Sequence, residues 1–113
     1  MVDLSTSLRR DIDIGREFTR FPAGRYVTDG NFSGEKFRET VLIPALRAYR
    51  ELRIFLDGTM GYGSSFLEEA FGGLVRAGFD KQDLLRRLLL VSNDRSIVEE
   101  IQEYITKAEC TSR

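Results

Sequence analysis

Residues 52–76, LRIFLDGTMGYGSSFLEEAFGGLVR, contain a strand-like run, a glycine-rich loop and a helix-like run in succession. The first six residues are mostly apolar and end in the carboxylate of Asp57, which is typical of a buried strand that leads into a loop. From Ser65 onward, apolar residues recur at spacings of three and four, which predicts an amphipathic helix. Gly78 is expected to end that helix.

Strand-like and helix-like segments also alternate on both sides of this stretch. Three further extended pieces are predicted at 11–14, 24–31 and 88–92. Helical periodicity starts again after Ser33, a suitable N-cap, and near Ser96. The alternation predicts an α/β fold, a small single domain over residues 1–113 with a mainly parallel or mixed sheet of about four strands and about three helices. Residues 1–9 and 108–113 are expected to be flexible ends.

Local signals refine these helices. Pro44 has no amide hydrogen, so a kink or a split is expected near Ile43. Ser96 followed by Glu99 fits a capping box at the start of the last helix. Residues 80–85, DKQDLL, are interpreted as a turn or a short helix.

Composition excludes several classes of function. The chain has 113 residues, 17 basic and 18 acidic, so its net charge of -1 disfavours nucleic-acid binding. Its apolar runs are far shorter than the roughly 20 residues that span a bilayer, and residues 1–8 do not resemble a secretory signal. With a single cysteine, Cys110, the expected location is the cytoplasm. Because the chain has no histidine, no metal or other cofactor and no histidine-based catalysis are expected.

The predicted parallel topology places several polar and glycine residues at one edge of the sheet. Loops that follow parallel strands meet at their carboxyl ends, where ligands usually bind. The predicted partner- or anion-binding edge therefore contains Asp57, Gly58, Gly61, Gly63, Asn93 and Asp94.

The loop from Gly58 to Ser65 allows a chemical interpretation as a phosphate-binding loop. It matches G-x-x-x-x-G-K-[ST] at all positions except the lysine, where Ser64 stands. A dinucleotide fingerprint is also incomplete, because Phe66 occupies the position of its third glycine. A nucleotide- or phosphate-binding domain with Asp57 as a cation ligand is thus one alternative.

Two other interpretations concern the serines themselves. Ser65 and Glu68 fit a capping box, and Ser64 could cap the helix instead; either role requires no ligand and suits a structural or oligomerising domain. Alternatively, a phosphate on Ser65 would add about -1.5 to -2 charges at the positive end of a helix and so regulate a partner. These alternatives remain open from the residues alone.

Two motifs carry a resemblance to a known family. PAGRYVTDGNFSGEKFRETVLIPAL, residues 22–46, followed by LDGTMGYGSSFLEEAFGGLVR, residues 56–76, resembles the bacterial STAS-like family of unassigned function. The resemblance implies an α/β fold related to the STAS domain of anti-sigma factor antagonists. In those antagonists, a partner kinase of the histidine-kinase-like ATPase superfamily phosphorylates a serine or threonine at the start of the helix after a central strand, which releases the partner.

The resemblance therefore implies a phosphoacceptor at Ser65, with Ser64 as the second choice. It implies a non-catalytic protein-binding module in a partner switch, with an ATPase of that superfamily as partner. The net charge and the short apolar runs predict no nucleic-acid partner and no membrane. Gly63 replaces the acidic residue of the usual antagonist motif and Phe66 replaces its glycine. Arg25, Asp29 and Ser33 either extend the same edge into a polar site or are turn and helix-surface residues, the commoner role of such residues.

Overall fold

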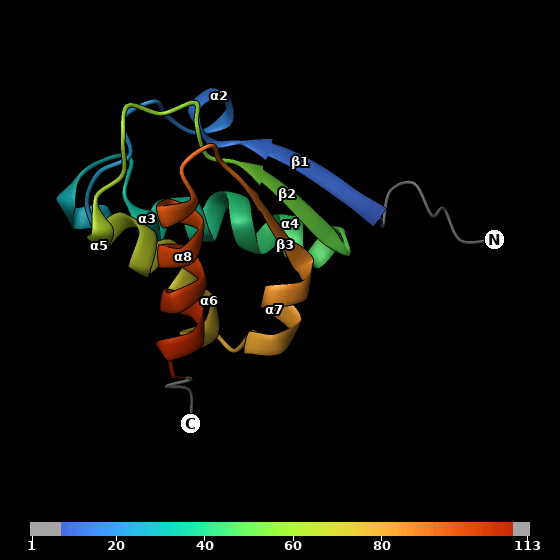
Figure 1. Cartoon of the computed structure of the whole chain (residues 1–113). Helices are drawn as coiled ribbons and strands as arrows, with labels where there is room; N and C mark the ends of the chain where they lie inside the picture. The colour runs from blue at the N-terminus through green and yellow to red at the C-terminus, as the bar shows by residue number, and fades with distance from the viewer. Residues whose placement is uncertain (1–7, 110–113) are drawn as a thin grey trace.

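The computed structural model describes residues 8–109 and contains a three-stranded parallel sheet (Figure 1). The strands are β1 (Arg9–Asp13), β2 (Glu51–Phe55) and β3 (Leu88–Val91), and they lie side by side in that order. In the register, Ile12 pairs with Ile54 and Ile54 with Leu90. The predicted α/β class and parallel pairing are confirmed, whereas the described residues form three strands rather than about four.

Among the described residues, five helical segments accompany the sheet, where the sequence predicts about three. They are α2 (Ile14–Glu17), a helix composed of α3 (Gly34–Phe37), η2 (Arg38–Leu42) and α4 (Ile43–Ala48), a second composed of α5 (Ser64–Leu67), η3 (Glu68–Gly72) and α6 (Gly73–Arg76), then α7 (Lys81–Arg87) and α8 (Arg95–Lys107). Both composite helices contain a π-helical turn, η2 or η3, at their centre. The composite helices lie on the same side of the sheet, and α8 packs against η3 (Figure 1).

The core lies between the sheet and these helices. Ile12, Leu52 and Ile54 point into it from the strands and are fully buried. On the helix side, the ring of Phe37 lies 5.9 Å from that of Phe66 and 6.4 Å from that of Phe71. Burying an aromatic side chain contributes more to stability than burying most other residues, so these rings hold the two composite helices together.

The other face of the sheet is not covered by any described element. It carries Asp11, whose carboxylate accepts two hydrogen bonds from Arg53 at 3.0 and 2.8 Å. The guanidinium of Arg53 also lies 5.3 Å from the centre of the Phe55 ring. Fully buried positions alternate with half-buried ones along β2, and Ile12 of β1 is buried between less buried neighbours, as this one-sided packing requires.

The extended piece predicted at 24–31 is wrong. The chain there forms a 3-10 turn, η1 (Val27–Asp29), instead of a strand. Asp29 accepts hydrogen bonds from the amides of Arg25 and Tyr26, and Glu35 accepts one from the amide of Val27. Because side chains satisfy these amides, the segment needs no neighbouring strand.

The helix that contains Pro44 is irregular at the position where the sequence predicts a kink or a split. The hydrogen-bonding pattern changes at Ile43, where the π-helical turn η2 ends and α4 begins. Pro44 cannot donate to the preceding turn, and a wider turn before it accommodates the missing hydrogen bond. The helix therefore continues through the proline with altered hydrogen bonding.

Both predicted capping boxes are wrong, although both helices form. Gly63 is the N-cap of α5, with no side-chain capping bond, so Ser64 is the first helical residue. Asp94, not Ser96, caps α8, and its carboxylate accepts from both the amide and the hydroxyl of Ser96. By contrast, Ser33 caps α3 as predicted, because its hydroxyl accepts from the amide of Lys36 at 3.1 Å.

The predicted flexible ends fall mostly outside the described residues, which exclude 1–7 and 110–113. Within the described part, Arg9 pairs with Glu51 in the sheet and Ala108 is buried. Among residues 8–109, none of the helices is both long and apolar enough to cross a membrane.

Candidate functional site

The carboxyl edge of the sheet brings together the residues that follow β2 and β3. Asp57 accepts hydrogen bonds from the hydroxyl of Ser92 at 2.5 Å and from the amide of Asn93 at 2.8 Å. The Ser92 hydroxyl in turn accepts from the amide of Asp94 at 2.9 Å. These hydrogen bonds hold Asp57, after β2, against the turn of Asn93 and Asp94, after β3. The parallel topology predicts that these residues lie together.

Gly58 lies where the loops after β1 and β2 touch. A side chain at Gly15 would overlap the carbonyl group of Gly58, and a side chain at Gly58 would lie 2.8 Å from a carboxylate oxygen of Asp13. Nearby, Tyr62 donates to the carbonyl oxygen of Leu56 at 2.7 Å. Burial, aided by the charges of Asp13 and Asp57, raises the pKa of Tyr62 to about 12. The loop is therefore packed closely onto the strand ends at its base.

Farther from the strand ends, the loop is exposed, and two of its backbone amides already donate hydrogen bonds within the fold. Gly61 has a φ of 131°, a conformation that favours glycine. The amide of Met60 donates to the carbonyl oxygen of Arg20 at 2.8 Å, and the amide of Gly61 donates to the hydroxyl of Thr59 at 3.3 Å. These two amides are not free to surround a phosphate group.

Ser64 and Ser65 are both exposed at the start of α5, directly after Gly63. Ser64 lies beside the hydroxyl of Tyr104 on α8, which donates to Glu100 at 2.5 Å. The bond to Glu100 is the main reason that the pKa of Tyr104 is raised to about 12, and the Ser64 hydroxyl opposes this shift. Both serine hydroxyls are thus accessible to a large partner.

A cluster of three arginines and two glutamates fixes the 20–32 segment against the helix that follows these serines. Arg25 contacts Glu68 at 2.5 Å and Glu69 at 3.3 Å. Arg76 contacts Glu68 at 2.7 Å, and Arg38 contacts Glu69 at 2.7 Å. Glu68 and Glu69 are the first two residues of the π-helical turn η3, so both acidic residues of this network belong to the irregular turn. π-helical turns occur frequently at functional sites.

The remaining predicted residues have structural partners. Asp29 closes the turn of η1 through the amides of Arg25 and Tyr26. Ser33 is fully buried as the cap of α3. Arg25, in contrast, is partly exposed and reaches the helix of the two serines.

The ion pairs of Glu68 predict a pH dependence of stability. The hydrogen bond from Arg76 is the main reason that the pKa of Glu68 lies below its ordinary value of 4.5; burial opposes this and Arg25 adds to it. Because the folded state lowers this pKa, the stabilisation is complete above about pH 4.5 and is lost as the pH falls through the folded-state value.

Urea unfolding of the wild type and of Glu68→Gln from pH 7 to pH 3 measures this effect. The difference between their free energies of unfolding should be largest near neutral pH and shrink below about pH 4.5. A difference that stays constant over this range would contradict the assignment.

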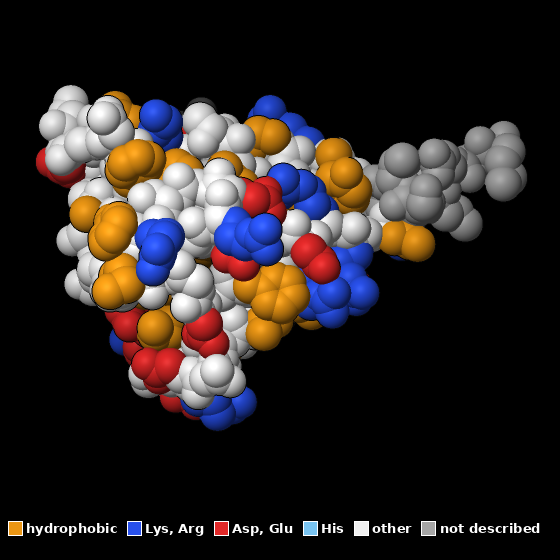
Figure 2. Space-filling view, turned by 90° about the horizontal axis from the view of Figure 1, so that it is seen from above, with side chains coloured by type: hydrophobic (Ala, Val, Ile, Leu, Met, Phe, Trp, Pro, Cys, Tyr) orange, Lys and Arg blue, Asp and Glu red, His pale blue; other side chains and the backbone are white. Residues whose placement is uncertain are grey.

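An exposed apolar surface adjoins the serines, and the sequence patterns do not predict it. Phe21 is 65% exposed and Met60 68% exposed, and their segments are joined by the hydrogen bond from Met60 to Arg20. We call the following set the apolar patch: Phe21, Tyr26, Val27, Phe32 and Met60. Figure 2 shows several hydrophobic side chains, with polar surface between them, at the end of the molecule where the 20–32 segment and the loop lie. The signal in the sequence was a run of aromatic residues without strand or helix periodicity.

Within residues 8–109, no group of three or more histidine, cysteine, aspartate or glutamate residues is placed to hold a metal ion.

Comparison with known proteins supports the family suggested by the motifs. The family described as STAS-like domain of unknown function (DUF4325) matches residues 33–98, which run from the cap of α3 into α8. No curated protein and no solved structure matches the chain. The matched region contains both composite helices, β2, β3 and the serines, and the chain therefore belongs to the STAS-like DUF4325 family.

Proposed function

We propose that this protein is a non-catalytic protein-binding module of a partner-switch system. Its partner is a histidine-kinase-like ATPase or a similar regulator, and the complex forms in the cytoplasm at the edge around Ser64 and Ser65. Phosphorylation of one of these serines weakens the complex. The observation that carries the proposal is the apolar patch beside two exposed serines.

The patch suits a protein partner better than a small ligand. Several exposed apolar side chains close together often mark an interaction site, and aromatic and methionine side chains are enriched in interfaces. The patch is also held in place, because Arg25 ties the segment with Tyr26 and Val27 to Glu68. A fixed surface loses little conformational entropy on binding.

Nucleotide binding by the same loop has less support. The loop has no lysine for the terminal phosphates, and the amides of Met60 and Gly61 already have partners. A phosphate attached to a serine, by comparison, needs no preformed binding site in this loop, because its charge can act directly on the partner.

Size-exclusion chromatography and calorimetry with ATPases encoded near this protein test the proposal. We expect a complex with one of them, and a loss in affinity of about tenfold or more for Phe21→Ser combined with Met60→Ser, since hot-spot residues at the centre of an interface have effects of this size. Leu8→Ser is the matched control, because Leu8 is an exposed apolar residue at the opposite end of β1.

The role of the serines needs a separate measurement. Incubation of the complex with ATP and mass spectrometry should locate a phosphate on Ser64 or Ser65. Aspartate at the modified position should release the partner, whereas alanine should retain it. The absence of any complex, or binding that tolerates the Phe21 and Met60 double variant, would refute the proposed interface.

A further inference from the structure

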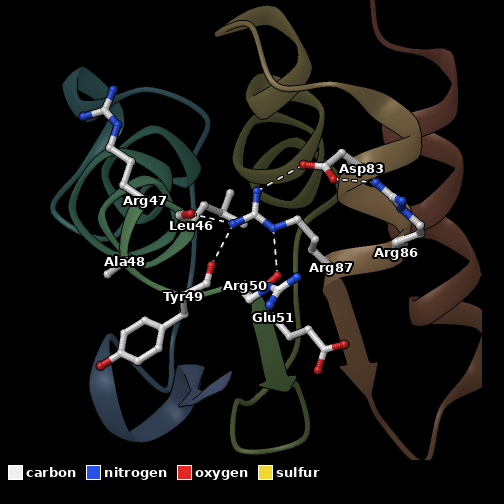
Figure 3. Close-up of a pocket in the computed structure, with 9 residues that line it drawn as sticks. All are labelled: Leu46, Arg47, Ala48, Tyr49, Arg50, Glu51, Asp83, Arg86 and Arg87. Atoms are coloured by element: carbon white, nitrogen blue, oxygen red, sulfur yellow. Dashed lines mark hydrogen bonds and ion pairs between the residues drawn. The ribbon is translucent and has the colours of Figure 1, made fainter. Parts of the chain in front are cut away.

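The amino edge of the sheet, opposite the serines, contains a second surface with a different character. Arg87, at the end of α7, donates hydrogen bonds to the carbonyl oxygens of Arg50 and Tyr49 at 2.8 and 2.7 Å, and to that of Leu46. It also contacts Asp83 at 3.2 Å (Figure 3). Arg87 thereby fixes the turn between α4 and β2, and its own charge is largely used within the fold.

Arg87 forms one wall of an open hollow of about 570 Å³ that other arginines also line. Arg47, Arg50 and Arg86 also line this hollow, from α4, the turn before β2 and α7, and all three are exposed (Figure 3). Arg86 pairs with Asp83 at 2.6 Å. Among residues 8–109, Arg47 and Arg50 have no ion-pair partner, so both guanidinium groups are available to a ligand.

Two other hollows lie beside this one around Tyr49. One, of about 740 Å³, extends along the start of β1, and the other, of about 330 Å³, lies between β1 and α4. Tyr49 lines all three, and we call the surface formed by these neighbouring hollows the arginine groove. Its basic side chains are Arg9, Arg10, Arg47, Arg50, Arg86 and Arg87.

The charge of the groove differs in sign from that of the whole chain. The six arginines face four carboxylates, which gives the groove a formal charge of +2, whereas the chain as a whole carries -1. The carboxylates are those of Asp11, Glu17, Glu51 and Asp83.

We propose that the arginine groove binds an extended acidic segment of a protein partner. Guanidinium groups bind carboxylates through paired hydrogen bonds, and the exposed Arg47 and Arg50 offer such pairs. The half-buried ring of Tyr49 and the neighbouring Ala48 supply apolar contacts between the charges. Nucleic acid suits the groove less well, because a tightly bound strand requires many phosphate contacts and the net positive charge is small.

The site is independent of the proposed function at the serines. Parallel strands place their amino ends at one edge and their carboxyl ends at the other, so the hollow lined by Arg47, Arg50 and Arg86 and the apolar patch lie at opposite ends of the sheet. A variant can therefore lose one activity and keep the other.

Fluorescence anisotropy with a labelled peptide rich in aspartate and glutamate, containing one leucine, tests this inference on the full chain. We expect saturable binding that weakens with added salt. Arg47→Glu combined with Arg50→Glu should weaken it by about tenfold, because two exposed charge pairs are lost and replaced by repulsion. Within residues 8–109, neither side chain makes a hydrogen bond, and circular dichroism verifies that the double variant is folded.

The control is a second double variant that changes the net charge by the same amount at positions outside the groove. Arg20→Glu combined with Arg95→Glu alters exposed arginines after α2 and on α8, outside the groove, and should leave peptide affinity within about twofold. Absence of peptide binding, or equal losses in the two double variants, would overturn the inference. Tighter binding of an oligothymidylate of equal charge would overturn it in favour of single-stranded nucleic acid.

Discussion

Replacing Arg38 by methionine is expected to lower the free energy of unfolding by about 3–5 kcal/mol. Its guanidinium donates to the carboxylate and the carbonyl oxygen of Glu69 at 2.7 and 2.8 Å, and the two side chains are only 12% and 9% exposed. Methionine preserves most of the volume but leaves the carboxylate of Glu69 without its closest cation. Gly73 is part of this arrangement, because a side chain there would overlap the Arg38 guanidinium.

Chemical unfolding monitored by circular dichroism measures this loss. The matched control is Arg53→Met, which breaks an ion pair of similar distance with Asp11 on the exposed face of the sheet. The control should shift the unfolding midpoint far less, since solvent weakens exposed pairs. Equal shifts for Arg38→Met and Arg53→Met would show that burial does not strengthen the Arg38 pair. Arg38→Lys, which keeps the charge but not the planar fork, should fall between the wild type and Arg38→Met.

Phe37→Ala is expected to destabilise the domain by about 3–5 kcal/mol, because it leaves a cavity at the centre of the aromatic cluster. Phe37 is fully buried, and its ring lies 5.1 Å from that of Phe18 as well as near Phe66 and Phe71. The loss therefore affects the contact between the two composite helices and the segment after β1.

Thermal and urea unfolding of Phe37→Ala should be compared with Phe21→Ala. Phe21 is 65% exposed, so its truncation should change the free energy of unfolding by no more than about 0.5 kcal/mol. Because Phe21 belongs to the apolar patch, its truncation should nevertheless weaken partner binding. A stability loss for Phe21→Ala close to that of Phe37→Ala would mean that the patch is part of the core.

The strands and the parallel sheet were predictable because their signals are local. The apolar runs at 52–57 and 88–92 are too short for helices and stand between helical periodicities, which leaves little choice of structure. The turn at Asp57, Asn93 and Asp94 followed from the topology alone. The segment at 24–31 was not predictable in this way, because the side chains of Asp29 and Glu35 replace a strand partner.

The wrong prediction at Ser65 has a similar cause. Spacing suggested that Glu68 would return to the helix N-terminus, but its carboxylate is held by Arg25, which lies 43 residues away in sequence, and by Arg76. Single-sequence periodicity contains no information about such distant pairs. The arginine groove escaped prediction for the same reason, because its members come from separate segments that only the folded sheet brings together.

The strand pairing also governs the order in which the chain can fold during synthesis. Arg9 at the start of β1 pairs with Glu51, and Leu52 of β2 pairs with Leu88 of β3. Contacts between residues so distant in sequence are slow to form, because the intervening chain must first be closed into a loop. β1 leaves the ribosome first but acquires its partner only after the composite helix of α3 and α4 has been made, so this helix can serve as its first packing surface.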